Sequence, residues 1–342
     1  MNDSKLGRKL SARLPVGRRA ADRAAVLVAI GGLGLAACSP GISGDDPGTS
    51  LQTVNYAYSG IAAATLPELL IQSDPAMCAP FGIKPQVAVL SASASSPAVA
   101  AGKVDVKRGA STSFLLTEVE NPGEAKIVAT VTGGQPAKVW GSKDVRTITD
   151  LRDKTVAAAS AGSGTDISVR EALSEAGLTP GKDVRITYSN TANALFGLAE
   201  SGAIQGFVQT SPLPATLTKN GWHELADAAH SPLTALPLKT VITANTTFIH
   251  DHPAAIKGLL QCMAAAEHAV NADRGKATEL LAKAARIDGA AAAEQVAAIQ
   301  PFGLAEFRPE DLTTLANVLR KNYGKDFSKV NVLSAVDNSF LP

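Results

Sequence analysis

The sequence predicts an α/β protein built from two lobes, and two observations carry this expectation. Over residues 51–220, short apolar runs alternate with segments of helical periodicity, the pattern of parallel strands joined by right-handed helical crossovers. The chain has 342 residues, more than one ordinary core needs, which favours about two domains. From Pro253 onward the pattern changes to helices alone, and we expect this helical tail to pack on the first lobe.

The apolar runs and helical patterns give the expected elements in chain order. Strands are expected over residues 53–58, 85–91, 103–106, 125–131, 137–142, 153–160, 183–189 and 203–209. Helices are expected over residues 62–73, 95–102, 166–177, 191–202, 211–221, 253–270, 275–286, 289–299 and 309–324. Thr165 is the expected N-cap of the third helix, which would place Asp166 at its first position, and Gly177 is its expected left-handed C-cap.

The composition is that of a globular protein with few rings, since charged residues make up 18%, hydrophobic residues 45% and aromatic residues 4%. Seven of the 32 basic residues and two of the 31 acidic residues lie in residues 1–37, so the rest carries 25 basic against 29 acidic residues. A mildly acidic body argues against nucleic acid as a partner, because nucleic acid requires a basic surface.

Residues 1–37 have the layout of an export signal: a basic stretch up to Arg23, then an uncharged run that is too short to span a bilayer. The sequence "LAAC" ending at Cys38 resembles the lipobox of bacterial lipoproteins, which implies cleavage before Cys38 and a lipid on its thiol. We therefore expect a lipoprotein on the outer face of the cell membrane, with residues 38–50 as a flexible tether. The paired arginines of "GRRAAD" leave twin-arginine export as an alternative to the general route.

Two cysteines remain in the body, Cys78 and Cys262. In an oxidising compartment such a pair either forms a disulfide or stays as two separately buried thiols, and the sequence leaves both alternatives open.

Small polar clusters follow five of the expected strands, and ligands of parallel sheets bind at those carboxyl ends. Each cluster begins a helix, where free N–H groups and the helix dipole favour an electron-rich ligand group, although Ser, Thr and Asn also cap helices for stability alone. The candidate ligand-binding residues are Tyr58, Ser59, Gly60, Arg108, Gly109, Ser111, Ser163, Gly164, Thr165, Asn190, Thr191 and Thr210.

Two charged residues at these clusters favour ligands of opposite charge. The guanidinium of Arg108, beside a glycine turn, suits a sulfonate, carboxylate or phosphate, unless it is a solvated surface arginine. The carboxylate of Asp166 would oppose a strongly anionic ligand at the Gly-Ser loop. The sequence therefore predicts a small polar or anionic solute and leaves its charge open.

Motifs of catalysis and of cofactor binding are missing. Gly162 and Gly164 lack the spacing and the Lys of a nucleotide-binding loop, and no metalloprotease, serine-hydrolase or Cys-His arrangement occurs. His250, Asp251 and His252 stand directly before a helix start, where turn and capping roles account for them. We therefore expect no enzyme, no cofactor and no metal site.

Several stretches together resemble the extracytoplasmic solute-binding proteins of ABC importers in the nitrate, sulfonate and taurine group, with the SsuA/THI5-like (NMT1-like) domain. The first-lobe stretches are "VAAGKVDV" and "IVATVTGG", and the second-lobe entry is "ITDLRDKTVAAASAGSGTDISVREALSEAGLTPGKDV". They are followed by "NALFGLAESGAIQGFVQTSP", by "FIHDHPAAIKGLLQCMAAAEHAVNAD" and by the tail "VDNSFL". The resemblance covers essentially the whole mature chain. One departure is at Gln205 and Gly206, where members of the family commonly have an acidic residue followed by Ala.

The resemblance implies a periplasmic-binding-protein fold of type II, with two mixed sheets flanked by helices and a cleft between the lobes. It places lobe one at residues 51–138 and 243–342, lobe two at 144–238, and hinge strands at 139–143 and 239–242. It also implies that the candidate residues line the cleft and that the protein, a monomer, delivers its solute to the permease subunits of an ABC importer. The alternatives are a sensor or scaffold lipoprotein of the same fold that binds a partner protein, and a pyrimidine-synthesising enzyme, whose cysteine-rich motif this chain lacks.

Overall fold

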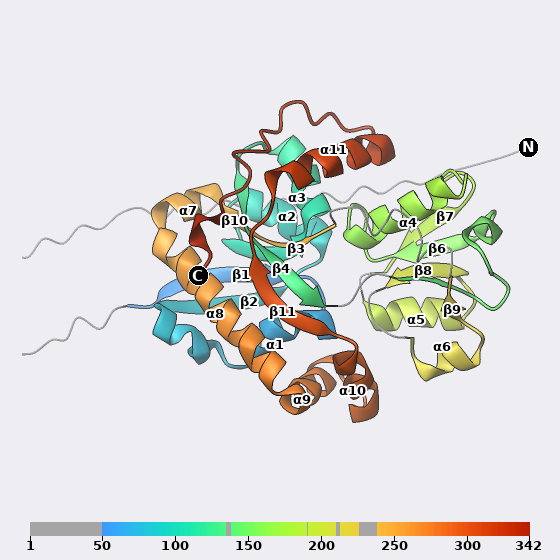
Figure 1. Cartoon of the computed structure of the whole chain (residues 1–342), viewed down its shortest axis with the longest axis horizontal. Coiled ribbons are helices and arrows are strands. Elements are labelled where there is room, and N and C mark those ends of the chain that lie inside the picture. The colour runs from blue at the N-terminus through green and yellow to red at the C-terminus, as the bar shows by residue number, and fades with distance from the viewer. Residues whose placement is uncertain (1–49, 135–137, 190, 210–212, 226–237) are drawn as a thin grey trace, which may run out of the picture. The chain divides into compact units, whose positions relative to one another are not determined.

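Two mixed β-sheets flanked by helices make up the computed structural model, which describes residues 50–134, 138–189, 191–209, 213–225 and 238–342 (Figure 1). The expected fold class is therefore confirmed. Within this described part, no helix is both long enough and apolar enough to cross a bilayer.

The first sheet has the strand order β11-β4-β10-β3-β1-β2. Its strands are β1 (Gln52–Tyr58), β2 (Ile83–Val89), β3 (Val106–Ala110), β4 (Ala125–Gly134), β10 (Thr240–Asn245) and β11 (Gln300–Ala305). Strand β1 is parallel to β2 and β3, whereas β10 is antiparallel to β3 and β4, and β11 is antiparallel to β4. This sheet is therefore mixed, as the resemblance implied, and β10 and β11 run against its other strands.

The second sheet has the order β7-β6-β8-β5-β9. Its strands are β5 (Lys138–Gly141), β6 (Thr155–Ala158), β7 (Arg185–Tyr188), β8 (Gly206–Gln209) and β9 (His223–Glu224). Strand β6 is parallel to β7 and β8, and β5 is antiparallel to β8 and β9. The residues expected as hinges, 139–143 and 239–242, overlap β5 and β10, and their role as hinges stays a prediction.

Helices cover both sheets. Those near the first sheet are α1 (Leu66–Ser73), α2 (Ala92–Ala100), α3 (Ser111–Glu120), α7 (Thr246–Asp251), α8 (Pro253–Ala272), α9 (Arg274–Ala285), α10 (Gly289–Ala297) and α11 (Pro309–Tyr323). Those near the second sheet are α4 (Gly164–Glu175), α5 (Ala192–Glu200) and α6 (Ala215–Lys219). The described residues also form short 3-10 turns at Ala63–Thr65, Pro75–Phe81, Ile148–Leu151 and Asn338–Phe340.

Two expectations about strands are corrected. The strand expected at 103–106 lies at Val106–Ala110 instead, so Arg108 and Gly109 belong to β3 and not to a loop after it. The tail after Pro253 is not wholly helical, because β11 pairs with β4 across a register shift between Gln300 and Gly303.

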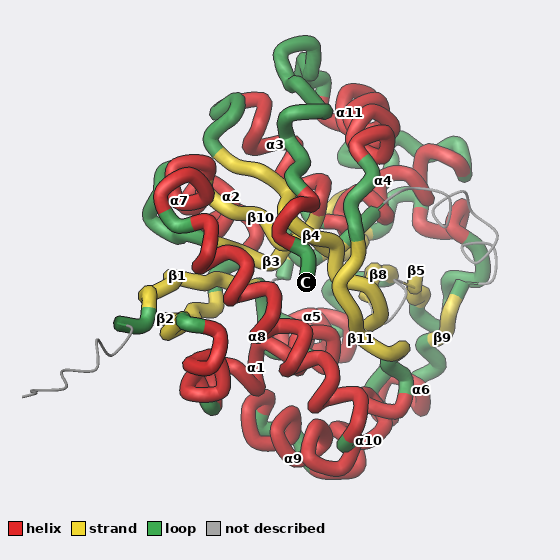
Figure 2. Tube along the Cα trace, turned by 60° about the vertical axis from the view of Figure 1, so that its left-hand side comes forward, coloured by secondary structure: helices red, strands yellow, loops and turns green. Residues whose placement is uncertain are grey.

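The hydrophobic cores lie on the faces of the sheets. On one face of the first sheet, Tyr56 and Tyr58 pack with residues of α1 and α8, and on the other face Phe114 and Leu115 pack with Leu315 of α11. Helix α8 therefore packs on the first sheet, as expected, and Figure 2 shows it running past α1.

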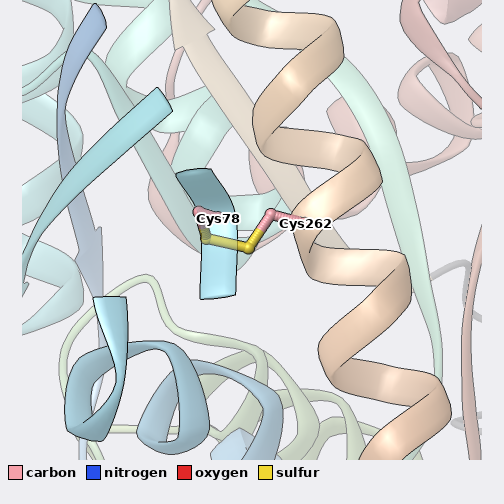
Figure 3. The surroundings of a disulfide bond; sticks show 2 residues. All are labelled: Cys78 and Cys262. Carbon is pink, nitrogen blue, oxygen red and sulfur yellow. A yellow bond between two sulfur atoms is a disulfide. The ribbon is translucent and has the colours of Figure 1, made fainter. Parts of the chain in front are cut away.

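A disulfide joins Cys78, in the 3-10 turn Pro75–Phe81, to Cys262 of α8, with their Cα atoms 5.1 Å apart (Figure 3). Of the two alternatives that the sequence left open, a disulfide or two separate thiols, the structure has the disulfide. Both cysteines are fully buried. Gly258 lies one turn before Cys262 and makes this approach possible, because a Cβ there would stand 2.3 Å from the carbonyl oxygen of Phe81.

Candidate functional site

The Gly-Ser loop after β6 is folded around the start of α4. Ser163, not Thr165, is the N-cap, since its Oγ accepts a hydrogen bond from the backbone N–H of Asp166 at 3.3 Å. Gly164 is the first helical residue, so Asp166 stands at the third helical position instead of the first. The expected N-cap is thus wrong by two residues, and the preceding turn includes Gly162 with a φ of +74°.

Thr165 has a different role from the expected one. Its Oγ1 accepts a hydrogen bond from the N–H of Ala159 at 3.0 Å and lies 3.0 Å from the Oγ of Ser163. The loop hydroxyls thus hold the end of β6 against the start of α4.

Arg108 is buried in the first sheet, where its Nη1 makes an ion pair with Oε2 of Glu68 on α1 at 3.3 Å. Tyr56 donates a hydrogen bond to the other oxygen of Glu68 at 3.1 Å. Glu267 of α8 adds a second buried carboxyl, and burial, followed by the charge of Glu68, raises its pKa to about 8. Arg108 is therefore neither a loop residue nor a solvated one, and its charge is balanced inside the protein.

Tyr58, the last residue of β1, points into the core, and its hydroxyl donates to Gln72 at 2.7 Å. Burial, with the nearby charge of Glu68, raises the pKa of its phenol to about 12. Of the three residues expected at this strand end, only Ser59 and Gly60 are not buried, and Gly60 adopts a φ of +81°.

The starts of α3 and α4, which follow strands of different sheets, lie in contact. Thr112 and Ser113 donate hydrogen bonds to the carbonyl oxygen of Gly162 at 2.9 and 3.2 Å. A Cβ on Gly164 would stand 4.0 Å from the Cβ of Ala110, the residue before α3. Ser111, the first residue of α3, accepts a hydrogen bond from the N–H of Lys239 at 3.2 Å. The structure therefore brings the start of α3, which includes Ser111, next to the Gly-Ser loop, which includes Ser163 and Gly164.

A second set of contacts joins α4 to the end of α11, and the sequence did not indicate it. Asp166 is fully buried and accepts hydrogen bonds from the N–H of Gly162 at 2.9 Å, from Arg170 at 3.0 Å and from the hydroxyl of Tyr323. One turn along α4, Glu171 pairs with Lys321 of α11 at 3.1 Å. The charge of Asp166 is balanced by Arg170. The carboxylate of Asp166 therefore does not repel an anion at the Gly-Ser loop, contrary to expectation.

No described contact joins the remaining candidate residues to the starts of α3 and α4. Thr191 caps α5 by accepting a hydrogen bond from the N–H of Ala194 at 3.3 Å. Asn190, Thr210 and Cys38 lie outside the described residues.

His250, Asp251 and His252 lie where α7 ends and α8 begins. The imidazole of His250 lies 2.7 Å from Asp251 at the end of α7, and both side chains are largely exposed. Among the described residues, no group of three or more His, Cys, Asp or Glu side chains could hold a metal ion.

Two cavities of the described part lie elsewhere. One of about 540 Å³ is lined by residues of β1 and β2 with Gln72, and one of about 340 Å³ by residues such as Asp105 and Asn245. Neither is lined by a candidate residue. At the contact between α3 and α4 the chain is closely packed, since Ser111 and Thr112 are fully buried.

A family model, the NMT1-like family, matches residues 97–286 of the chain. No curated protein has a matching sequence. The aliphatic sulphonate-binding protein SsuA of Escherichia coli has a similar structure, with a TM-score of 0.67, 16% identity, and coverage of 84% of this chain and 92% of that one.

Two further structures have the same fold. The alkanesulfonate-binding protein SsuA of Xanthomonas axonopodis pv. citri, bound to MOPS, has a TM-score of 0.68 and 16% identity, with coverage of 83% of this chain and 98% of that one. The nitrate-binding protein NrtA of Synechocystis PCC 6803 has a TM-score of 0.65 and 15% identity, with coverage of 85% and 87%. All three are binding proteins by name.

Proposed function

The chain belongs to the NMT1-like family, and from this premise we propose that it is the solute-binding component of an ABC importer. It captures one small polar or anionic solute, such as a sulfonate, nitrate, a carboxylate or a pyrimidine-like compound, and passes it to the permease subunits. The similarity to sulfonate- and nitrate-binding proteins supports the kind of solute but does not name it.

One observation carries this proposal: the starts of two helices, one from each sheet, meet at the Gly-Ser loop. The hydrogen bonds from Thr112 and Ser113 to Gly162 join them across about 50 residues of sequence. Helix starts supply N–H groups and a positive dipole end, and a solute held between two of them is bound by both sheets at once.

The site is proposed to open and close through two lobes, with lobe one at 51–138 and 243–342, lobe two at 144–238, and hinges at 139–143 and 239–242. In such a protein the solute stabilises the closed state by its higher affinity for that state. The candidate residues that supply polar groups from each side include Ser59, Ser111 and Thr191.

The location proposed for this protein is the outer face of the cell membrane. Residues 1–37 would be removed as an export signal, Cys38 would carry the lipid, and residues 38–50 would act as the tether. The disulfide between Cys78 and Cys262 supports an oxidising compartment. We expect the protein to act as a monomer.

The test is a thermal unfolding screen of the full-length protein against taurine, alkanesulfonates, nitrate, aromatic carboxylates, pyrimidines and amino acids. A solute that binds only the folded state raises the midpoint of unfolding in proportion to the logarithm of its concentration. A saturable shift with one of these classes supports the proposal. A folded, monodisperse protein that shifts with none of them contradicts it and favours the partner-binding alternative.

A further inference from the structure

The side chain of Lys107 in β3 is 1% exposed, and its Nζ donates a hydrogen bond to the Oγ of Ser96 on α2. Among the described residues no carboxylate pairs with this ammonium group. Lysine is rarely fully buried without an opposite charge, because taking an ammonium group out of water is costly. The burial alone lowers its pKa to about 8.

Lys107 and Arg108 lie on opposite faces of β3, because successive side chains of a strand alternate. Arg108 faces α1, where Glu68 balances its charge at 3.3 Å. Lys107 faces α2 and has no such partner among the described residues. The unbalanced positive charge of this strand therefore belongs to Lys107.

The ammonium group lies beside the proposed site. A Cβ on Gly109 would stand 3.0 Å from Nζ, so the side chain of Lys107 extends toward the carboxyl end of β3. The next residue, Ala110, faces Gly164 of the Gly-Ser loop. A side chain at position 109 would therefore crowd Nζ, and glycine avoids this contact.

Two features of α2 and α3 also lack partners. The Oγ of Ser95 is buried without a hydrogen-bond partner in the described part of the chain. Helices α2 and α3 both begin without a side-chain cap, at Ser91 and Ala110 respectively. Uncapped helix starts and an unpaired ammonium group favour the same kind of ligand group, an anion.

We propose that Lys107 binds the negatively charged group of the solute, a carboxylate or a sulfonate, and so makes the site specific for anions. The inference rests on the proposed function. Access requires the contacts of Thr112 and Ser113 with Gly162 to open, after which the solute supplies the counter-charge that Lys107 lacks.

The test is isothermal titration calorimetry of the full-length protein with ethanesulfonate, benzoate and nitrate, and with the neutral analogues ethanesulfonamide and benzamide. We expect an anion to bind and its amide to bind at least about 30-fold more weakly, the loss typical of an unpaired buried charge. The variant Lys107→Met keeps the length of the side chain and removes the charge, and we expect it to lose affinity for the anion by at least the same factor.

The control variant is Lys84→Met, which removes an exposed lysine of β2 and should leave the affinity unchanged. Circular dichroism checks that Lys107→Met is folded, as expected for the removal of an unpaired buried charge. A neutral analogue that binds as tightly as its anion, or undiminished anion binding by Lys107→Met, overturns this inference and leaves the receptor proposal standing. If none of the five probes binds to the folded protein, the inference is overturned and the receptor proposal also loses support.

Discussion

Two consecutive basic residues of β3 have opposite surroundings, and this difference decides what each can do. Arg108 is paired with Glu68, whereas Lys107 donates to the hydroxyl of Ser96 and has no carboxylate partner among the described residues. From the sequence, Arg108 was either an anion-binding residue beside a glycine turn or a solvated surface arginine, and the structure shows neither surrounding. The burial of a lysine in a strand could not be predicted from the sequence, since lysine in a strand normally faces solvent.

Replacing Arg108 should mainly change stability. Arg108→Met leaves the carboxylate of Glu68 buried without its partner, and we expect the free energy of unfolding to fall by about 3–5 kcal/mol, measured by urea unfolding. The matched control is Arg152→Met, which breaks the exposed pair with Asp183 and should cost less than about 1 kcal/mol. Equal losses in the two variants would show that the buried pair is not the main role of Arg108.

The buried carboxyl of Glu267 should make stability depend on pH. Its pKa is raised by burial from 4.5 to about 8, so the folded state holds this proton at pH values where the unfolded state has released it. The contribution of this carboxyl to stability is therefore full below pH 4.5 and is lost as the pH rises through 8. Urea unfolding between pH 4 and 9 should show this fall, and Glu267→Gln should flatten it.

The control for that series is Glu294→Gln, an exposed residue of α10, which should keep the wild-type profile. A Glu267→Gln profile as steep as that of the wild type would mean that another group causes the dependence.

At the scale of elements, the approach of α8 to the 3-10 turn Pro75–Phe81 depends on one glycine. In Gly258→Ala the new Cβ would stand 2.3 Å from the carbonyl oxygen of Phe81, so α8 must shift, and we expect a loss of about 1–3 kcal/mol in the free energy of unfolding. The same substitution at Gly197 of α5 meets nothing within 4 Å and should stabilise by up to about 1 kcal/mol. A Gly258→Ala variant as stable as Gly197→Ala would contradict this packing.

The elements that the sequence predicted best are those with strong periodicity, such as α8 and α11. The expected elements also lacked the helices α3 and α7. The strands that the sequence missed or misplaced depend on pairing across the sheet. β3 includes Gly109 because β10 pairs with it residue by residue, and β11 forms despite Pro301 and Gly303 because it pairs with β4 at the edge of the sheet. Local propensity does not contain this information.

At the scale of the whole molecule, the alternation of strands and helices was enough to predict the α/β class, and the resemblance added the two mixed sheets. It was not enough to predict which residues of the two sheets meet. The contact of Asp166 with Tyr323 joins residues 157 apart in sequence, and no motif marks it. The expected lobe boundaries and hinges stay predictions.

The central claim is that one solute is held by helix starts from both sheets. Hydrogen–deuterium exchange of the full-length protein, with and without a solute identified by the unfolding screen, tests it most directly. We predict slower exchange of the backbone amides at the starts of both α3, around Ser111–Ser113, and α4, around Ser163–Asp166, with no change in α9. Protection confined to one sheet, or to the cavity beside Gln72, would contradict the claim.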